Sequence, residues 1–160
     1  MTLCERLARL IENASYRGRL AVIVPANILT IDLARDAGSP QWVTKWEHPR
    51  TKKTFTLRVL SSGNLSDRDL NACFELIAET SESDYRNSSV GWHPDKKLKE
   101  MKSAELRYIL VKDGDGDGDG DGDSDSGGSV RAFTSMMPTY EAGQPVVYCY
   151  EIHLKPDLRG

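Results

Sequence analysis

The chain has 160 residues, 39% of them hydrophobic, which is enough for one domain with a packed core. Its formal charge of −3 is unevenly spread, because residues 113–128 hold seven aspartates and no basic residue, which leaves 17 of the 24 acidic residues against 21 basic ones elsewhere. This mildly basic body lacks the clustered, strongly basic surface that nucleic-acid binding requires. No apolar run approaches the roughly 18 residues of a membrane span.

The cysteines and the N-terminal residues predict a soluble, intracellular protein. Three cysteines are widely spaced, without a CxxC pair, which argues against a zinc knuckle or a disulfide framework. Residues 1–18 carry acidic side chains and no long apolar run, so they do not resemble a signal peptide.

The first 63 residues contain one predicted helix and one predicted strand. Leucines at helical spacing predict a helix over 2–14, and the residues that follow are interrupted by Pro25 and carry no clear pattern. We interpret 41–53, which contain two tryptophans, as a packed loop. Alternating apolar residues predict a half-buried strand over 54–63.

Two helices are predicted next. Ser66 has the chemistry of an N-cap, and four apolar residues follow at the spacing of one helix face: Leu70, Cys73, Phe74 and Ile77. The polar residues 81–89 predict that this helix loosens into a loop containing Tyr85. Asp95 is predicted to cap a short second helix that turns Leu98 and Met101 inward and its lysines outward.

Three strands are predicted at 106–113, 129–140 and 146–154. The first two are expected to form a hairpin whose loop is the Asp/Gly tract. The element order predicts an α+β fold with an antiparallel sheet.

The Asp/Gly tract at 113–128 invites a calcium interpretation, which its spacing excludes. An EF-hand loop closes with an acidic ligand at position 12. Every Asp of the tract has an odd number, so position 12 always falls on an even-numbered residue, and from 114 to 128 these are all Gly or Ser. We expect a disordered, polyanionic loop.

The last strand contains a carboxylate. Strict alternation would put Val146, Tyr148, Tyr150, Ile152 and Leu154 on one face, and Val147, Cys149, Glu151 and His153 on the other. Glu151 is then partly buried and must be paired, protonated or used in chemistry. An ordinary ion pair and a functional role both stay open. His153 is expected to be a core or surface histidine, and no residues have the spacing of a metal site.

Three stretches of the sequence are similar to one known family: "SDYRNSSVGWHPDKKLKEM", "LRYILVKD" and the terminal "VVYCYEIHLKPDLRG". They resemble the NatD-type N-terminal acetyltransferases of the GNAT superfamily, which acetylate the N-terminal serine of two core histones. The resemblance runs from about residue 54 to 160, outside the tract, and more loosely through the N-terminal helix.

The resemblance implies a reaction and the residues that perform it. Acetyl would pass from acetyl-CoA to the α-amine of a peptide that starts Ser-Gly-Arg-Gly. Glu151 matches the residue with a base-like role. Tyr150 matches an aromatic residue that orients the peptide and protonates or steers the departing thiolate.

The same resemblance implies a peptide groove lined by Tyr85, Trp92, Glu141, Tyr148 and Tyr150. Without the family, plain packing is the alternative for Tyr85 and Trp92. Val90 and Thr139 stand where some members carry a tryptophan and an aspartate, so the acid that binds the histone arginine is not assigned by the resemblance alone.

The implied cofactor-binding residues lie at the end of the chain. Backbone groups of Ile152, His153 and Leu154 match the segment that pairs with the pantetheine arm of acetyl-CoA. Arg159 and Gly160 match the start of the pyrophosphate loop, Arg/Gln-x-x-Gly-x-Gly/Ala. Because the sequence stops there, we expect a chain truncated inside this loop, without the C-terminal half of the fold, that is inactive by itself.

The domain organisation follows from these assignments. We expect an N-terminal helix and irregular extension over 1–53 and a partial GNAT domain over 54–160, interrupted by the tract. The expected partners are acetyl-CoA and histone N-terminal tails, without metal, nucleic acid or membrane, in a monomer of the nucleus and cytoplasm. The alternative is a non-catalytic, GNAT-like module that binds basic histone tails.

Overall fold

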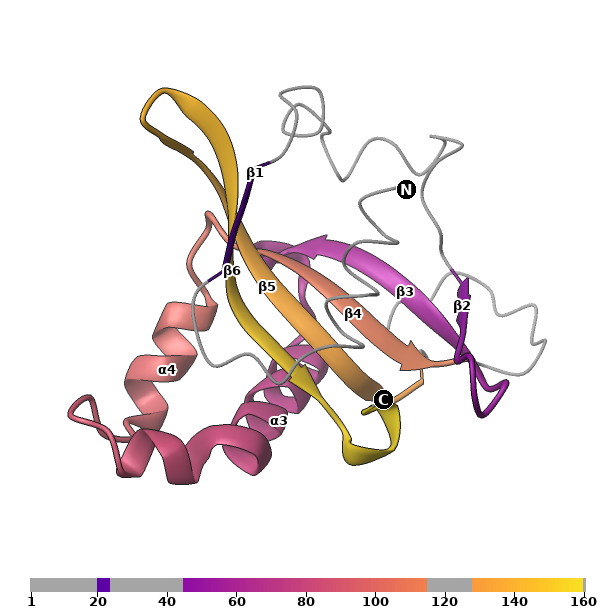
Figure 1. The fold of residues 1–160 in the computed structure, drawn as a ribbon. Coiled ribbons are helices and arrows are strands. Elements are labelled where there is room, and N and C mark those ends of the chain that lie inside the picture. The colour runs from indigo at the N-terminus through magenta and orange to yellow at the C-terminus, as the bar shows by residue number, and fades with distance from the viewer. Residues whose placement is uncertain (1–19, 24–44, 115–127, 160) are drawn as a thin grey trace.

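The computed structural model describes residues 20–23, 45–114 and 128–159 of the chain. The predicted helix over 2–14 and most of the Asp/Gly tract lie outside these residues. In the described part, the strands form one antiparallel sheet in the order β1-β6-β5-β4-β3-β2, and α3 and α4 lie against one face of it (Figure 1). The elements are β1 (Leu20–Ile23), β2 (Lys45–Glu47), β3 (Thr54–Ser61), η1 (Ser62–Asn64), α3 (Asp67–Arg86), α4 (Pro94–Met101), β4 (Arg107–Asp113), β5 (Val130–Glu141), β6 (Gln144–Leu154) and η2 (Pro156–Leu158).

This arrangement confirms the α+β class and the antiparallel sheet. The strands β1 and β2 were not predicted. Both come from the first 53 residues, and they lie at the two edges of the sheet. The interpretation of 41–53 as a loop is wrong for 45–47, because Trp46 pairs with Phe55 in the ladder and packs on its ring with centroids 5.7 Å apart.

Two hairpins connect the long strands. The predicted β4–β5 hairpin around the tract is confirmed, and its base is fixed by a bond from the Asp113 N–H to the Ser129 carbonyl at 3.0 Å. A Cβ on Gly128 would lie 2.3 Å from the Asp113 carbonyl oxygen, so this position has room for glycine alone. The β5–β6 hairpin turns through Ala142 and Gly143, both with positive φ, as a two-residue hairpin turn requires. It extends well beyond the rest of the sheet (Figure 1).

The long helix begins as predicted and ends later. Ser66 is the N-cap, and its Oγ accepts the Asp69 N–H at 3.1 Å. The prediction of a loop over 81–89 is wrong, because α3 continues to Arg86 and includes Tyr85. An ion pair between Glu82 and Arg86, one turn apart, and the packing of Tyr85 stabilise this polar last turn.

The short helix differs from its prediction in two respects. Asp95 lies in its first turn, whereas the N-cap position is held by His93, which makes no side-chain cap bond; Pro94 at the first position fixes the start instead. The lysines do not all point outward, because Lys97 is 8% exposed and turns toward the sheet. Lys97 turns inward because it forms an ion pair with the carboxylate of Glu151 on β6.

The sheet separates two apolar clusters. The helix-side cluster is larger and joins α3 and α4 to the sheet through Leu70, Cys73, Leu76, Ile77, Met101, Leu106, Tyr108, Leu110, Val130 and Phe133. The opposite-face cluster comprises Phe55, Val111, Ala132, Leu154 and Leu158. Neither described α-helix has the length and apolar content needed to cross a bilayer.

Candidate functional site

A β-bulge in the middle of β6 determines where its side chains lie. Ser135 of β5 is opposite Glu151, but the next residue, Met136, is opposite Cys149, so Tyr150 is the extra residue. Tyr150 packs against the helix-side cluster, whereas Ile152 and Leu154 belong to the opposite face. The predicted strict alternation is therefore wrong at Tyr150. The bulge places Tyr150 and Glu151 together on the helix side.

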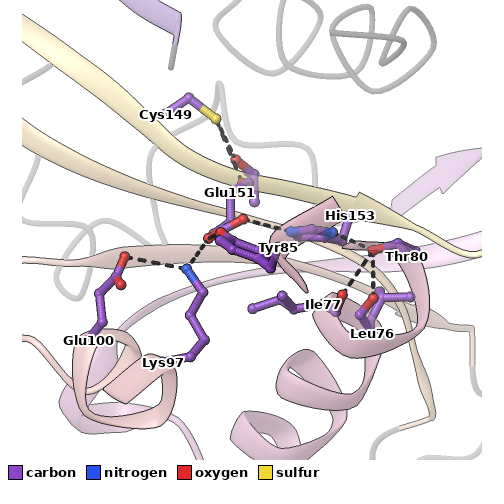
Figure 2. A network of polar contacts seen from close by, with 10 residues as sticks. Leu76, Ile77, Thr80, Tyr85, Lys97, Glu100, Cys149, Glu151 and His153 are labelled. Carbon is purple, nitrogen blue, oxygen red and sulfur yellow. Dashed lines mark hydrogen bonds and ion pairs between the residues drawn. The ribbon is translucent and has the colours of Figure 1, made fainter. Parts of the chain in front are cut away.

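Glu151 is the centre of a buried polar network between β6, α3 and α4 (Figure 2). Its side chain is 13% exposed. Oε1 accepts from the Lys97 ammonium at 2.5 Å and from the Tyr85 hydroxyl at 3.3 Å, and Oε2 lies 2.7 Å from His153 Nε2. The ion pair that the sequence left open is thus present, and it is accompanied by a histidine and a phenol.

The network keeps the carboxylate ionised. Burial alone would raise the pKa of Glu151, but the hydrogen bond from His153 and the charge of Lys97 outweigh it and lower that pKa. Burial alone would lower the pKa of Lys97, and its contacts with Glu151 and Tyr85 raise it instead. Burial and the nearby Glu151 charge raise the pKa of Tyr85, so its phenol stays neutral. Glu151 and Lys97 are a charged pair across the neutral pH range.

His153 is buried at the far side of this carboxylate. Its Nδ1 lies 2.6 Å from Thr80 Oγ1 on α3, and its ring stacks on Phe133 with centroids 5.4 Å apart. Of the two expected positions, core or surface, His153 occupies the core. Within the described ranges, no group of three or more His, Cys, Asp or Glu side chains could hold a metal ion.

The predicted aromatic residues of the groove pack on one another. The Trp92 ring lies 5.7 Å from Phe74 and 5.5 Å from Tyr85 between ring centroids, and Lys97 Nζ lies 5.1 Å from the Tyr85 ring. Both Tyr85 and Trp92 are partly exposed, so they support the network and also reach the surface beside it. Trp92 follows Gly91, whose positive φ makes the turn between the two helices.

Two further predicted groove residues, Glu141 and Tyr148, meet on the β5–β6 hairpin. The Tyr148 hydroxyl donates to Glu141 Oε2 at 2.8 Å. This hydrogen bond is the main reason why the pKa of Tyr148 is raised. Glu141 is exposed near the hairpin turn, and Tyr148 pairs with Met137. The structure thus brings Glu141 and Tyr148 together and records no contact between this pair and Glu151.

Three of the predicted cofactor residues, Ile152, His153 and Leu154, lie at the end of β6, and the prediction that the backbone of all three is free to pair with the cofactor is wrong for His153. The bond from the Lys155 N–H to the Arg131 carbonyl fixes the hydrogen-bonded register with β5. By alternation, His153 directs its backbone groups toward Phe133, and Ile152 and Leu154 direct theirs to the other edge. In the described part of the chain, β1 pairs with β6 only at Val146–Cys149 and leaves this edge uncovered.

Arg159 lies next to this edge. Its side chain donates to the Leu154 carbonyl at 3.3 Å, and its own carbonyl accepts from Arg50 at 3.0 Å. Gly160 lies outside the described residues. The outward backbone groups of Ile152 and Leu154 have the spacing to pair with an extended amide chain, and the Leu154 carbonyl is bound by the Arg159 side chain.

Sequence reasoning missed two members of the network, Lys97 and Thr80. A signal existed for Lys97, because it precedes Met101 by four residues and so shares the buried face of α4. Thr80 carried no comparable signal, since it lies in a polar stretch and its role depends on a residue 73 positions away.

Comparison with known proteins gives a related enzyme. N-alpha-acetyltransferase 40 of Saccharomyces cerevisiae is 32% identical to this chain over 111 residues, which are 59% of this chain and 34% of the yeast protein. The chain therefore spans about a third of the length of this curated relative. No protein-family model matches the chain.

Proposed function

From its relationship to the NatD-type N-terminal acetyltransferases of the GNAT superfamily, we propose that this chain belongs to an enzyme that moves acetyl from acetyl-CoA to a protein α-amine. The observation that carries the proposal is the buried, ionised Glu151 at the bulge of β6, with Tyr150 next to it and Tyr85 on its carboxylate. Bulges are enriched beside active sites because they redirect a side chain that regular pleating would send elsewhere.

The chemistry that this site must supply is limited. An α-amine has a pKa near ~7.7–8.0, so much of it is already neutral at physiological pH. As the amine nitrogen bonds to the acetyl carbon, the carbon–sulfur bond breaks and the amine loses a proton, which Glu151 accepts directly or through one water. The departing thiolate takes a proton, for which the Tyr150 hydroxyl is our candidate. Acetyl-CoA contributes the activated thioester.

We further propose histone N-terminal tails that start Ser-Gly-Arg-Gly as the substrate. The support is the family resemblance together with a suitable pair of side chains on the hairpin. Glu141 is an exposed carboxylate held by Tyr148, and a peptide arginine could make charge-assisted hydrogen bonds with it. Tyr85, Trp92 and Tyr150 would contact the first residues of the peptide. Nuclear and cytoplasmic residence as a monomer belongs to the same proposal.

Acetyl-CoA would be held along the edge of β6 beyond Cys149, which β1 does not pair with in the described residues. Ile152 and Leu154 would offer their outward backbone groups to the pantetheine arm, whereas the backbone of His153 is paired with β5 and its buried ring contacts Glu151 and Thr80. Arg159 and Gly160 would begin the pyrophosphate loop. The sequence-based expectation that the 160-residue chain is inactive by itself stays a prediction.

A second candidate function is non-catalytic binding of basic histone tails. It is favoured by the ion pair itself, because a carboxylate held by Lys97 is a weaker base than a free one. Exposed Glu141 would then be the principal contact.

The two candidates separate in a transfer assay. We would compare the 160-residue chain with a chimera that continues past Gly160 with the corresponding segment of the yeast relative, using a Ser-Gly-Arg-Gly peptide. We expect transfer by the chimera and a loss of about 10²–10⁴-fold in Glu151→Gln, the range for a general base. Glu82→Gln, a change at a partly exposed residue on α3, is the matched control and should keep full activity. Full turnover by Glu151→Gln across pH would remove Glu151 from the base role.

Binding measurements complete the test. Isothermal titration of the 160-residue chain with acetyl-CoA is expected to give no measurable heat, and micromolar binding would refute the prediction that this chain is inactive for lack of its cofactor. Peptide binding by both proteins, with no transfer by either, would favour the non-catalytic module.

A further inference from the structure

We propose that Arg50 is a further acetyl-CoA-binding residue, which together with Arg159 would bind a phosphate group of the cofactor. The inference rests on the proposed function and adds a residue from the N-terminal part of the chain to the same site. It follows from a contact between two segments 109 positions apart, the turn between β2 and β3 and the segment that follows β6.

The turn between β2 and β3 is held by a buried histidine. His48 is 4% exposed, and its Nδ1 accepts the backbone N–H groups of Arg50 and Thr51, both at 3.2 Å. The His48 N–H donates to the Lys53 carbonyl and the Lys52 N–H donates to the His48 carbonyl, both at 2.9 Å. The backbone of Arg50 is therefore fixed before any ligand binds, which lowers the entropy cost of using its side chain for binding.

The segment after β6 is held against this turn. Leu158 is 3% exposed and belongs to the opposite-face cluster, together with Phe55 at the start of β3. Next to Leu158, a guanidinium nitrogen of Arg50 donates to the Arg159 carbonyl at 3.0 Å. This carbonyl is part of the peptide bond that leads to Gly160, so the Arg50 side chain lies where the proposed pyrophosphate loop begins.

Arg50 and Arg159 have no anionic partner among the described residues. The Arg50 guanidinium donates to the Arg159 carbonyl, and the Arg159 guanidinium donates to the Leu154 carbonyl at 3.3 Å. Neither forms an ion pair within the described ranges. A main-chain carbonyl satisfies only part of the donor set of a guanidinium and leaves its charge uncompensated. Both residues are exposed, so their remaining donors are available to a ligand.

The carboxylates at the same end of the sheet are bound by other cations. Asp113 at the end of β4 pairs with Lys53, and Asp157 of η2 pairs with Arg131, both at 2.6 Å. The turn and the segment after β6 thus present two guanidinium groups without a counter-charge among side chains that are already paired. Such a pair favours the binding of an anion that can accept from both groups.

In the proposed reaction, the anion that fits this pair is a phosphate group of acetyl-CoA. Guanidinium groups bind phosphate oxygens through parallel, charge-assisted N–H···O bonds. The thioester would lie near Glu151 and the pantetheine arm would run along β6 past Leu154, so the phosphate-bearing end of the cofactor would reach the segment that follows β6. The pyrophosphate and the 3′-phosphate of the cofactor share this chemistry, and the experiment below separates them.

Cofactor affinity tests the inference without any acetyl transfer. We would measure the dissociation constant of CoA by isothermal titration in the chimera that continues past Gly160. Arg50→Gln is expected to raise this constant about tenfold, the effect of losing one hydrogen bond to a charged group. Lys52→Gln is the matched control, because it removes a positive charge from the same turn whose partner is Glu47, and it should change the constant less than about twofold. Arg50→Lys keeps the charge without the planar fork and should lie between the two.

Two analogues show which phosphate is bound. If Arg50 contacts the 3′-phosphate, Arg50→Gln should leave the binding of 3′-dephospho-CoA unchanged. If it contacts the pyrophosphate, Arg50→Gln should weaken CoA and 3′-dephospho-CoA alike. With S-acetylpantetheine, which has no phosphate, as the acetyl donor, Arg50→Gln should keep the wild-type kcat/KM in either case. An equal loss with S-acetylpantetheine would mean that Arg50 acts only by holding the backbone of Arg159, and would overturn the inference.

The 160-residue chain allows a direct test of the two arginines. In ¹⁵N NMR spectra of the arginine side chains, titration with inorganic pyrophosphate at constant ionic strength should shift the signals of Arg50 and Arg159. Arg131, which pairs with Asp157, is the internal control and should keep its signal. No shift at Arg50, or an equal shift of every arginine from non-specific attraction, overturns the inference.

The outcomes separate this inference from the proposed function. An unchanged dissociation constant of CoA in Arg50→Gln, in a chimera that transfers acetyl, overturns the inference and leaves the proposed function intact. A chimera that binds CoA with the expected dependence on Arg50 but transfers no acetyl overturns the proposed function and supports Arg50 as a phosphate-binding residue. A chimera that binds no CoA overturns both.

Discussion

Two buried lysine–carboxylate pairs join the helices to the sheet, and they are built differently. Lys112 of β4 donates to both oxygens of Asp69, at 2.8 and 3.1 Å, with both side chains 7% exposed or less. Lys97 of α4 approaches one oxygen of Glu151 and leaves the other to His153. We call the first the closed pair, because one lysine binds both carboxylate oxygens, and the second the open pair, because one carboxylate oxygen contacts a further titratable group.

The difference follows from where each carboxylate lies. Asp69 is in the first turn of α3, where the helix dipole and the Ser66 cap favour a fixed anion. Glu151 lies at a bulge beside aromatic side chains that reach the surface. A carboxylate with both oxygens on one ammonium anchors a helix, and one that divides its oxygens between an ammonium and an imidazole has its basicity controlled by both partners.

The largest expected effect is the loss of the closed pair. In Lys112→Met, Asp69 stays buried without a counter-charge, so we expect the free energy of unfolding to fall by roughly 3–5 kcal/mol. Urea denaturation at pH 7 measures it. Lys112→Met combined with Asp69→Leu should recover most of the loss. A cost below about 1 kcal/mol for the single change would mean that the pair is not what anchors α3 to β4.

The open pair should cost less to break. In Lys97→Met, Glu151 keeps His153, so we expect a loss of about 1–3 kcal/mol, the cost of an incompletely satisfied buried group. The same urea experiment compares it directly with Lys112→Met. Equal losses in the two variants would contradict the idea that His153 shares the charge of Glu151.

The open pair should also make stability depend on pH in the acid range. The pKa of Glu151 is lowered in the folded chain from about 4.5, so its contribution to stability is complete above that pH and is lost as the pH falls through the folded value. In Lys97→Met, the hydrogen bonds from His153 and Tyr85 remain but the ammonium charge is gone, so the pKa of Glu151 should be lowered less and the acid-induced loss of stability should be smaller than in the wild type. Unfolding curves at pH 6 and pH 3.5 test this, with Ser66→Ala as a control that should follow the wild type.

A smaller effect is expected at the start of α3. Ser66→Ala removes the acceptor of the Asp69 N–H and should cost about 1 kcal/mol, whereas Ser66→Gly should cost only a few tenths. Thermal unfolding of both variants measures the difference. If the alanine variant were as stable as the wild type, the cap would not contribute to holding Asp69.

The smallest effect is expected at the exposed ion pair between Glu79 and Lys155. With side chains 46% and 30% exposed, this pair is screened by water, so Glu79→Gln should cost about 1 kcal/mol at most and less in high salt. Urea curves at 0.05 and 0.5 M NaCl measure it. A larger, salt-independent loss would place Glu79 in the His153 network.

Much of the fold could be read from local patterns. The strands β3 to β6 and the start of α3 follow from alternation, helical spacing and one serine cap, all properties of short segments. The end of α3 could not be read, because residues 81–86 have the composition of a loop and are helical through the packing of Tyr85 and a Glu82–Arg86 pair. The edge strand β2 was missed because its three residues carry too little pattern.

The candidate site likewise has a part that the sequence predicted and a part that only the tertiary structure showed. By itself, the sequence predicted an antiparallel sheet with a partly buried Glu151 on its last strand, and the family resemblance added Tyr150 and Tyr85 as residues to examine. Only the tertiary structure placed Lys97 and His153 on opposite oxygens of that carboxylate and Thr80 behind the histidine. The reason is that propensity and periodicity act over one or two turns, whereas the bulge at Tyr150 and the contacts of Glu151 depend on residues 54 and 66 positions away that meet only when the helices pack on the sheet.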